Sequence, residues 1–220
     1  MKKFELTDEF ITNAFGNKLF RIKAIVDFGT IRAGELGGFV EKEENLSNDD
    51  NAWVSGNARV SDDARISDDA RISGNAQVSG NASVFGNASV SDDAQVYGNA
   101  SVSDDAWVSG NAQVYGNARI SGNASVSDDA RISGNAQVYG NADYAVVEGF
   151  GRYFRATTFF RCKDKILRVQ CGCFYGDLAE FREIVKKTHG DSKYAKEYLA
   201  IADLMELHFS DDEGRQEAAE

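Results

Sequence analysis

Residues 94–106 read Ala-Gln-Val-Tyr-Gly-Asn-Ala-Ser-Val-Ser-Asp-Asp-Ala, which is two copies of a six-residue pattern and the start of a third. The pattern is alanine, a variable residue, Val or Ile, then Ser, Tyr or Phe, and finally Gly-Asn or Asp-Asp; it repeats from about Ala52 to Ala142. A unit of six residues is too short to bury an apolar face alone, so successive units must stack on one another. The repeat therefore predicts a solenoid.

Strict alternation within each unit assigns its side chains to two sides of a strand. Alanine and the following Val or Ile face inward, as Val102 does, whereas the variable residue and the residue after the valine, such as Ser103, face outward. Gly-Asn and Asp-Asp are turn sequences, because they tolerate left-handed backbone or form local side-chain turns. Each unit is thus predicted to be a short strand plus a corner, around a dry aliphatic interior.

Three units that close a triangle make a coil of eighteen residues, and this larger period arranges the outward residues in columns. Stacked identical polar residues in such columns can form a hydrogen-bonded ladder. One column before the valine contains Arg59, Gln77, Gln95, Gln113 and Arg131. One column after the valine contains Ser55, Ser73, Ser91, Ser109 and Ser127.

Aromatic residues occupy some of the outward positions and are candidates for protein contacts, because they bury a large area at a small entropy cost. Two lie one coil apart, Tyr97 and Tyr115; Trp53 and Trp107 share a second face, and Phe85 and Tyr139 a third. These faces can pack against sister chains or against a foreign partner, and the sequence leaves both open. The candidate binding residues are Trp53, Gln77, Gln95, Tyr97, Trp107, Gln113 and Tyr115.

The repeats resemble those of a known family. The segment Val60-Ser-Asp-Asp-Ala64-Arg follows the aliphatic-x-x-x-small-x pattern of hexapeptide-repeat, left-handed parallel β-helix proteins. That resemblance implies the left hand and a homotrimer or other homo-oligomer such as a dimer. The flanks resemble phage and prophage hexapeptide-repeat proteins labelled transferase-like or polymer-forming. They do so at Lys23–Phe28, Leu36–Glu41, Asn45–Ser47, Cys171–Phe174 and Tyr194–Tyr198.

The chain divides by pattern into four parts. Residues 1–50 are predicted to form an N-terminal β cap and irregular first coils, and residues 51–148 the β-helix. Residues 149–209 are predicted to form a C-terminal α+β module, a β-hairpin plus two helices. Asp177 and Glu180 have capping-box spacing for the first helix, Gly190 ends it, and the second runs from Ser192 to Phe209. Residues 210–220 read as an acidic disordered tail.

Composition limits the class of protein. The net charge is −11, which disfavours direct binding to nucleic-acid phosphates. No run of apolar residues reaches membrane-spanning length, and the acidic start argues against a secretory leader. Three cysteines suit a reducing compartment better than a disulfide scaffold. We therefore expect a cytoplasmic protein that does not contact membranes.

Hexapeptide-repeat acyltransferases, to which the repeats are similar, use a histidine near the helix as general base. The repeats contain none; His189 and His208 both lie in the C-terminal module. The sequence therefore predicts no enzyme, with an acyltransferase based on His189 as the alternative. A second alternative is an acidic nucleic-acid mimic, although arginines such as Arg71 and Arg119 interrupt the acidic surface.

Metal binding is not expected. Cys162, Cys171 and Cys173 lack the spacing of a zinc knuckle, and the Asp-Asp pairs are scattered over three corners instead of converging as calcium requires. No cofactor is predicted. The leading hypothesis is a non-enzymatic scaffold that self-associates and presents a rigid surface to a protein partner. The resemblance of the flanks implies a phage-encoded protein that acts on a host component.

Overall fold

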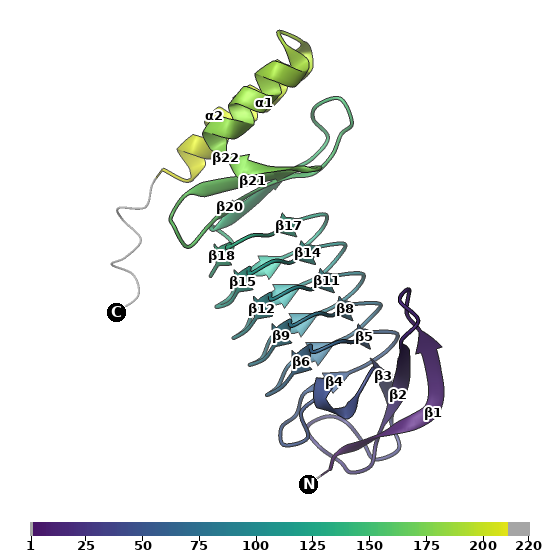
Figure 1. The fold of residues 1–220 in the computed structure, drawn as a ribbon. Coiled ribbons are helices and arrows are strands. Elements are labelled where there is room, and N and C mark those ends of the chain that lie inside the picture. Colours follow the sequence, from purple (N-terminus) through teal and green to yellow (C-terminus); the bar gives the residue numbers. More distant parts are fainter. Residues whose placement is uncertain (1, 211–220) are drawn as a thin grey trace, which may run out of the picture. The chain divides into compact units, whose positions relative to one another are not determined.

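The computed structural model describes residues 2–210, and the chain divides into two compact units between Asn141 and Ala142. The first unit contains an antiparallel N-terminal hairpin and a stack of two-residue strands in three parallel sheets (Figure 1). The second contains a four-stranded antiparallel sheet and two helices. The repeat region is therefore a β-solenoid, as its periodicity predicts.

Each coil of the solenoid adds one strand to each parallel sheet, and paired residues lie eighteen positions apart, as Gln95 and Gln113 do. The first sheet contains β5 (Arg59–Val60), β8 (Gln77–Val78), β11 (Gln95–Val96), β14 (Gln113–Val114) and β17 (Arg131–Ile132). The second contains β4 (Trp53–Val54), β7 (Arg71–Ile72), β10 (Ser89–Val90), β13 (Trp107–Val108) and β16 (Ser125–Val126). The third contains β6 (Arg65–Ile66), β9 (Ser83–Val84), β12 (Ser101–Val102), β15 (Arg119–Ile120) and β18 (Gln137–Val138). The predicted coil length is confirmed.

The solenoid interior is aliphatic throughout. Every inward Ala, Val and Ile from Ala52 to Val138 is at most 1% exposed, which confirms the predicted inward set. The prediction for Ser103 was wrong in one respect: it faces outward, yet it is only 9% exposed. Ser109 and Ser133, at the same position of their units, are also nearly buried, at 8% and 3% exposed.

The corners use two kinds of residue with positive φ. Gly74 and Asp92, for example, have φ of 67° and 58°. At four of the five corners where the residue is Asp, its carboxylate accepts a hydrogen bond from the backbone N–H of the glycine one coil later, at 3.1 Å from Asp92 to Gly110. The same bond joins Asp62 to Gly80, Asp68 to Gly86 and Asp104 to Gly122. The Asp-Asp corners therefore hold the next turn in place.

A side-chain ladder runs along one edge of the solenoid. Asn81 donates to Asn99, Asn99 to Asn117 and Asn117 to Asn135, at 3.0, 3.1 and 3.1 Å. We expected such ladders in the outward columns of Gln and Ser, and the structure forms them from corner asparagines instead. The corner backbone holds these short amides at a constant coil spacing, so each is both donor and acceptor.

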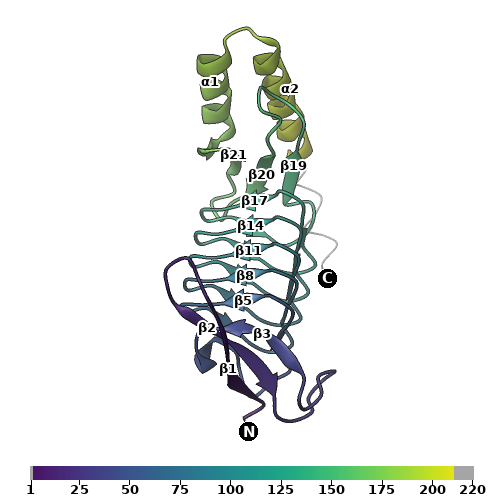
Figure 2. The ribbon, with the colours of Figure 1, turned by 90° about the vertical axis from the view of Figure 1, so that its right-hand side faces the viewer.

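The N-terminal cap extends the first sheet of the solenoid. The strands β1 (Phe4–Thr12) and β2 (Lys18–Ala24) form the predicted hairpin, and β3 (Leu36–Val40) pairs antiparallel with β2 and parallel with β5 (Figure 2). A short 3-10 helix, η1 (Glu43–Asn45), follows. Here Phe39 pairs with Arg59, twenty residues away, so this first connection is two residues longer than a regular coil.

A buried lysine fastens the start of the chain to this cap. Lys3 is 3% exposed, and its Nζ donates to the Asp50 carboxylate at 3.0 Å and to the carbonyls of Asp50 and Ala52 at 2.9 Å. Burial lowers the pKa of Lys3, although Asp50 opposes that shift. Burial acts to raise the pKa of Asp50, but hydrogen bonds from Ser47, Lys3 and the backbone lower it overall. Asp50 thus partly offsets the effect of burial on the Lys3 ammonium.

The second unit differs from the prediction in two ways. Its sheet has four strands in the order β19 (Tyr144–Val147), β20 (Thr157–Arg161), β21 (Leu167–Cys171) and β22 (Phe174–Asp177), and is not a simple hairpin. Residues 144–147, which were expected within the β-helix segment 51–148, form β19, and this strand pairs antiparallel with β20 instead of extending the solenoid. Residues 144–147 read Tyr-Ala-Val-Val, which breaks the hexad and frees this strand to join the other sheet.

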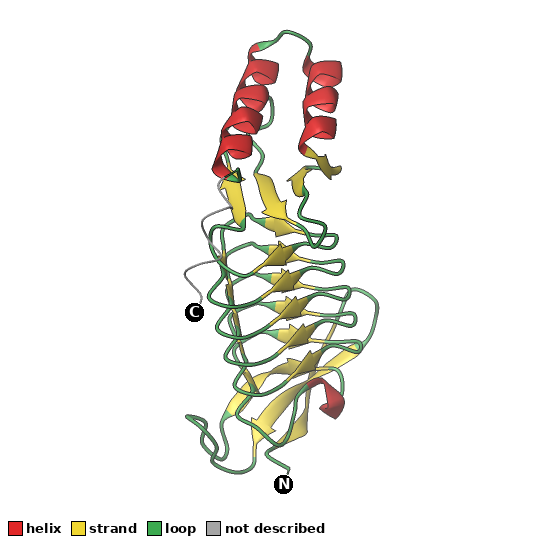
Figure 3. Cartoon of the chain, turned by 90° about the vertical axis from the view of Figure 1, so that its left-hand side faces the viewer, coloured by secondary structure: helices red, strands yellow, loops and turns green. Residues whose placement is uncertain are grey.

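The two helices, α1 (Leu178–His189) and α2 (Lys193–His208), are drawn in red in Figure 3. The capping box of Asp177 and Glu180 and the end of α1 at Gly190 are confirmed. Phe159, Phe181 and Met205 belong to the core that the helices and sheet share. Within residues 2–210, no helix is long and apolar enough to cross a membrane. The predicted acidic tail, apart from Ser210, lies outside the described residues.

Candidate functional site

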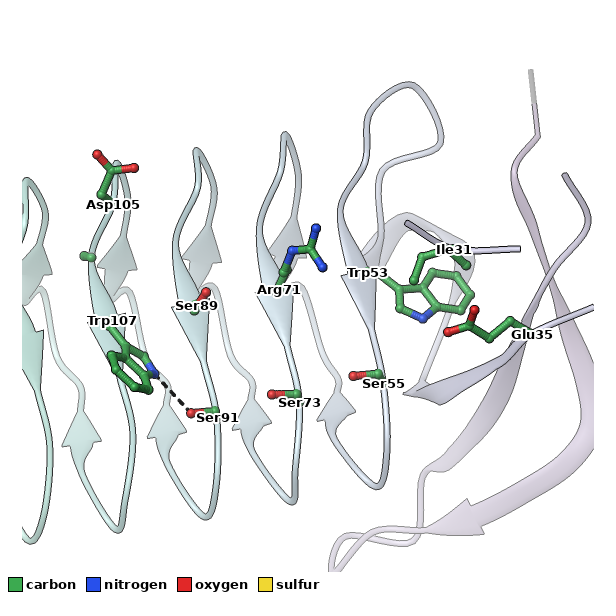
Figure 4. Close-up of a pocket in the computed structure, with 11 residues that line it drawn as sticks. Ile31, Glu35, Trp53, Ser55, Arg71, Ser73, Ser89, Ser91, Asp105 and Trp107 are labelled. Carbon is green, nitrogen blue, oxygen red and sulfur yellow. Dashed lines mark hydrogen bonds between the residues drawn. The ribbon is translucent and has the colours of Figure 1, made fainter. Parts of the chain in front are cut away.

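A groove of about 660 Å3 lies on the outer face of the second sheet, across strands β4, β7, β10 and β13 (Figure 4). It is open along the solenoid and has a tryptophan near each end. Its floor consists of serines and an arginine from successive coils. The lining residues are Ile31, Glu35, Trp53, Ser55, Arg71, Ser73, Ser89, Ser91, Asp105, Ala106 and Trp107.

Trp53 forms the N-terminal end of the groove. We expected an exposed column residue, but Trp53 is only 4% exposed, because Phe28 packs edge-on against its ring at 5.5 Å between centroids and Gly37 packs against the indole. Its Nε1 is buried and has no hydrogen-bond partner among residues 2–210. Ile31 and Glu35 line the same end of the groove (Figure 4). A buried, unpaired donor thus belongs to a residue that lines this end of the groove.

Trp107 forms the other end and is 51% exposed. Its Nε1 donates to the Ser91 hydroxyl at 3.1 Å, one coil earlier (Figure 4). This bond fixes the orientation of the indole and occupies its one donor. What remains available on Trp107 is therefore the aromatic ring.

The floor between the tryptophans is polar and regular. Ser55, Ser73 and Ser91 follow one another at the coil spacing of about 4.8 Å, as their column predicts. Arg71 lies between them and the cap, where its guanidinium donates to Thr30 at 3.4 Å. Asp105 lies on the rim. The floor therefore offers hydroxyls that donate and accept, one cation and carboxylates nearby.

A second candidate surface, which we call the Gln–Tyr strip, runs along the first sheet and its adjoining corners. It consists of Gln77, Gln95, Gln113, Tyr97, Tyr115, Asn81, Asn99 and Asn117. The rings of Tyr97 and Tyr115 are stacked with centroids 5.0 Å apart and planes 2° apart. Burial raises the pKa of Tyr97, and Tyr115 adds to this shift. The strip itself contains no charged side chain, and Arg59 and Arg131 of the same column lie at its two ends.

Charges are unevenly distributed over the three edges of the solenoid. The edge of the Gln–Tyr strip has one Asp-Asp pair, Asp62-Asp63, and then Gly-Asn in four successive coils. The other two edges contain the remaining pairs and flank the groove face. These pairs are Asp68-Asp69, Asp104-Asp105, Asp92-Asp93 and Asp128-Asp129. The edge with the four Gly-Asn corners therefore lies opposite the groove face in the triangular cross-section.

The candidate residues for catalysis and metal binding lie in the second unit. His189 is half-buried at the end of α1, with its ring 5.8 Å from that of Tyr198. Cys171 ends β21 and accepts a hydrogen bond from Thr157 at 3.2 Å, whereas Cys173 is exposed in the following turn, so the two do not share a strand as expected. Among residues 2–210, no three His, Cys, Asp or Glu side chains are grouped to hold a metal.

Sequence reasoning placed Trp107 and the serine column correctly but did not find the groove. Its N-terminal end comes from Ile31 and Glu35, in a segment that precedes the regular repeat. The longer first connection shifts this segment out of the eighteen-residue register, so no column could include it. The only available signal was that Trp53 stands in the first coil, where a cap must cover it.

Comparison with known proteins agrees with this architecture. Residues 64–78, 76–92, 94–110 and 112–128 match the family model described as YdcK Beta solenoid repeat. A search of curated proteins found no match. All four stretches lie within the three parallel sheets. The chain is therefore a β-solenoid repeat protein whose repeats are similar to those of the YdcK family.

Proposed function

We propose that this chain is a non-enzymatic scaffold whose copies associate through the Gln–Tyr strip. The observation that carries the proposal is the absence of charge from this strip on a chain with a net charge of −11. Like-charged copies repel each other, so they approach best where their surfaces are neutral. Tyrosine is also enriched in the cores of protein interfaces, where charged residues are depleted.

The geometry of the strip supports association between rigid surfaces. Tyr97 and Tyr115 are stacked on each other, and the asparagine ladder holds the adjoining corners. Few rotamers remain to be ordered on binding, which reduces the entropic cost of an interface. Association through the strip leaves the groove, which lies on the second sheet, outside the proposed interface. His189 lies in α1 and His208 in α2, and the repeat sequence contains no histidine, in keeping with a role without acyl transfer.

The strip can be tested by adding a charge without changing shape. We expect the wild-type chain to be a stable oligomer, a dimer or trimer, and Gln95→Glu to weaken association at least about tenfold, because each interface then contains facing carboxylates. Light scattering coupled to size-exclusion chromatography measures the mass. Gln137→Glu, on the third sheet, is the matched control and should leave the oligomer intact. A wild-type chain that is monomeric at all concentrations contradicts the proposal.

For the expected protein partner, we propose the loop between β19 and β20 in the second unit. Its residues 149–155 read Gly-Phe-Gly-Arg-Tyr-Phe-Arg. Tyr153 and Phe154 are 63% and 69% exposed, and Arg152 and Arg155 lie over the Tyr153 ring at 5.5 and 5.0 Å. Exposed aromatic and arginine side chains are the usual anchors of protein interfaces. The two arginines favour an acidic surface on the partner.

This loop is held at its base, which supports a defined binding surface. The Gly151 N–H donates to the Glu197 carboxylate at 2.9 Å, and a side chain at position 151 would overlap the Tyr198 ring. The hydrogen bond from Gly151 is the largest cause of the lowered pKa of Glu197. The carboxylate therefore stays ionised at neutral pH and keeps this anchor.

We expect Tyr153→Ala to reduce recovery of the partner at least about tenfold, since truncation of an interface anchor costs about 2 kcal/mol. Quantitative affinity capture with the full chain, followed by mass spectrometry, measures the recovery. Tyr139→Ala is the control, because Tyr139 is a similarly exposed tyrosine, at 58%, on the solenoid. Equal recovery with both variants and the wild type would show that the loop is not the binding surface.

A further inference from the structure

We propose that the groove between Trp53 and Trp107 binds a neutral oligosaccharide chain that runs along the solenoid. This inference goes beyond the scaffold role and does not depend on it, since the groove lies on the second sheet and the Gln–Tyr strip on the first. It rests on an unpaired buried donor, an exposed aromatic ring and a floor of evenly spaced hydroxyls.

The unpaired donor is the indole N–H of Trp53. Trp53 is 4% exposed, lines the groove and has no hydrogen-bond partner for Nε1. A buried donor without a partner costs about 1–3 kcal/mol, and an acceptor that arrives from the groove recovers that cost. The ligand must therefore bring an uncharged or negatively charged oxygen to this end. An ammonium or guanidinium group brings none.

The exposed ring is that of Trp107. Because its N–H is already bonded to Ser91, this side chain offers a ligand its aromatic surface alone. Aromatic rings have a negative face, which attracts the weakly positive C–H groups of an apolar surface. A pyranose ring presents such C–H groups on one face and hydroxyls around its edge. The groove thus pairs an apolar platform at one end with a polar donor at the other.

The floor suits a ligand that both donates and accepts hydrogen bonds. The Ser73 hydroxyl can do both, Ser91 can still donate while it accepts from Trp107, and Ser55 can still accept while it donates to the Ile72 carbonyl. Arg71 donates, and the Glu35 and Asp105 carboxylates accept. Sugar hydroxyls match such a mixed set, whereas the two carboxylates disfavour an anion and Arg71 disfavours a cation. The tryptophans are three coils apart, about 14 Å at the inter-strand spacing, which matches a short chain of sugar rings.

An extended peptide is a poorer occupant. Peptides that bind sheets usually add a strand to an exposed edge and form main-chain hydrogen bonds. Under this groove the strands are paired on both sides, β7 with β4 and β10, and β10 with β7 and β13. Their backbone groups are already bonded, so only side chains face the groove. A peptide would lose its main source of affinity here.

Tryptophan fluorescence tests the proposal directly, because the chain has two tryptophans and both line the groove. The full-length protein is titrated with cellotriose, maltotriose and chitotriose, and with trilysine as a cationic peptide. We expect a saturable change in fluorescence with at least one of the three saccharides. A response to trilysine but to no saccharide, or no response to any probe, overturns the proposal.

Variants separate this site from other surfaces. By calorimetry, Trp107→Ala should weaken binding of the responding saccharide at least tenfold, about 1.4 kcal/mol. Ser73→Ala, which removes one floor hydroxyl, should weaken it about fivefold. Phe85→Ala, an exposed aromatic outside the groove, should have no effect, and circular dichroism confirms that each variant is folded. Unchanged affinity in both groove variants overturns the proposal.

Discussion

Val102→Asp is expected to destabilise the solenoid by about 4 kcal/mol or more, because it places a carboxylate in the dry interior. Val102 is fully buried in strand β12, between Val84 and Ile120 of the adjacent coils. A carboxylate at this position has only aliphatic neighbours in its column and therefore no partner to replace water. Each coil contacts only its neighbours, so the damage divides the stack into two shorter solenoids.

Denaturant unfolding followed by circular dichroism measures this loss. A buried carboxyl without a partner has a raised pKa and keeps its proton in the folded state. The folded variant then binds more protons than the unfolded chain, so its stability falls as the pH rises above about 4. The loss should thus be smaller in mild acid than at neutral pH.

The control for this experiment has to be chosen from the structure. Ser103 is nearly buried, so an aspartate there is not a neutral reference. Ser101 is partly exposed, and its partner in the next coil is Arg119, which favours a carboxylate. Ser101→Asp should therefore change the free energy of unfolding by less than about 0.5 kcal/mol. A similar loss in Ser101→Asp and Val102→Asp would mean that the inward assignment is wrong.

Gly37→Ala is expected to cost about 1–3 kcal/mol through overpacking where β3 lies against the first coil. A Cβ at this position would be 2.5 Å from Ile22 Cγ1, 2.6 Å from the Val54 carbonyl oxygen and 2.7 Å from the Trp53 ring. The carbonyl belongs to a paired strand and cannot move aside without disturbing its sheet. Relief must therefore come from the cap and from Trp53.

Two measurements test the effect of Gly37→Ala. Thermal unfolding reports the loss of stability, and tryptophan fluorescence reports the displacement of Trp53. Gly140→Ala is the matched control, because a Cβ there meets nothing within 4 Å and its φ is not positive, so it should be neutral or slightly stabilising. If Gly37→Ala were as stable as Gly140→Ala, the close packing of the cap on β4 would be incorrect.

Much of the solenoid follows from local residue patterns. Its coil length, its inward aliphatic columns and the stack of Tyr97 on Tyr115 all depend on a period that is legible along the chain. The helix boundaries in the second unit could also be predicted from the sequence, because capping depends on residues three or four positions apart, as with Asp177 and Glu180. These features need no knowledge of distant contacts.

The candidate site was harder to predict from the sequence than the solenoid. Its serine floor and Trp107 lie in predictable columns, but its closed end depends on Ile31 and Glu35, which lie outside the period. Trp53 has the sequence position of an exposed residue and becomes buried because the cap covers it. The same limitation applies to β19, because the hexad that it interrupts does not predict its pairing with β20.

The six-residue pattern was therefore sufficient for the repeating architecture, because each side chain in a solenoid meets the same neighbours one coil away. It was not sufficient where a segment without the repeat packs on the first coil. Which polar atoms stay paired there depends on three features of the tertiary structure. These are the longer connection before β5, the buried Lys3–Asp50 pair and the fit of Gly37 against Trp53. The unpaired indole N–H that makes the groove a candidate site arises from that non-repeating contact, which has no period to reveal it.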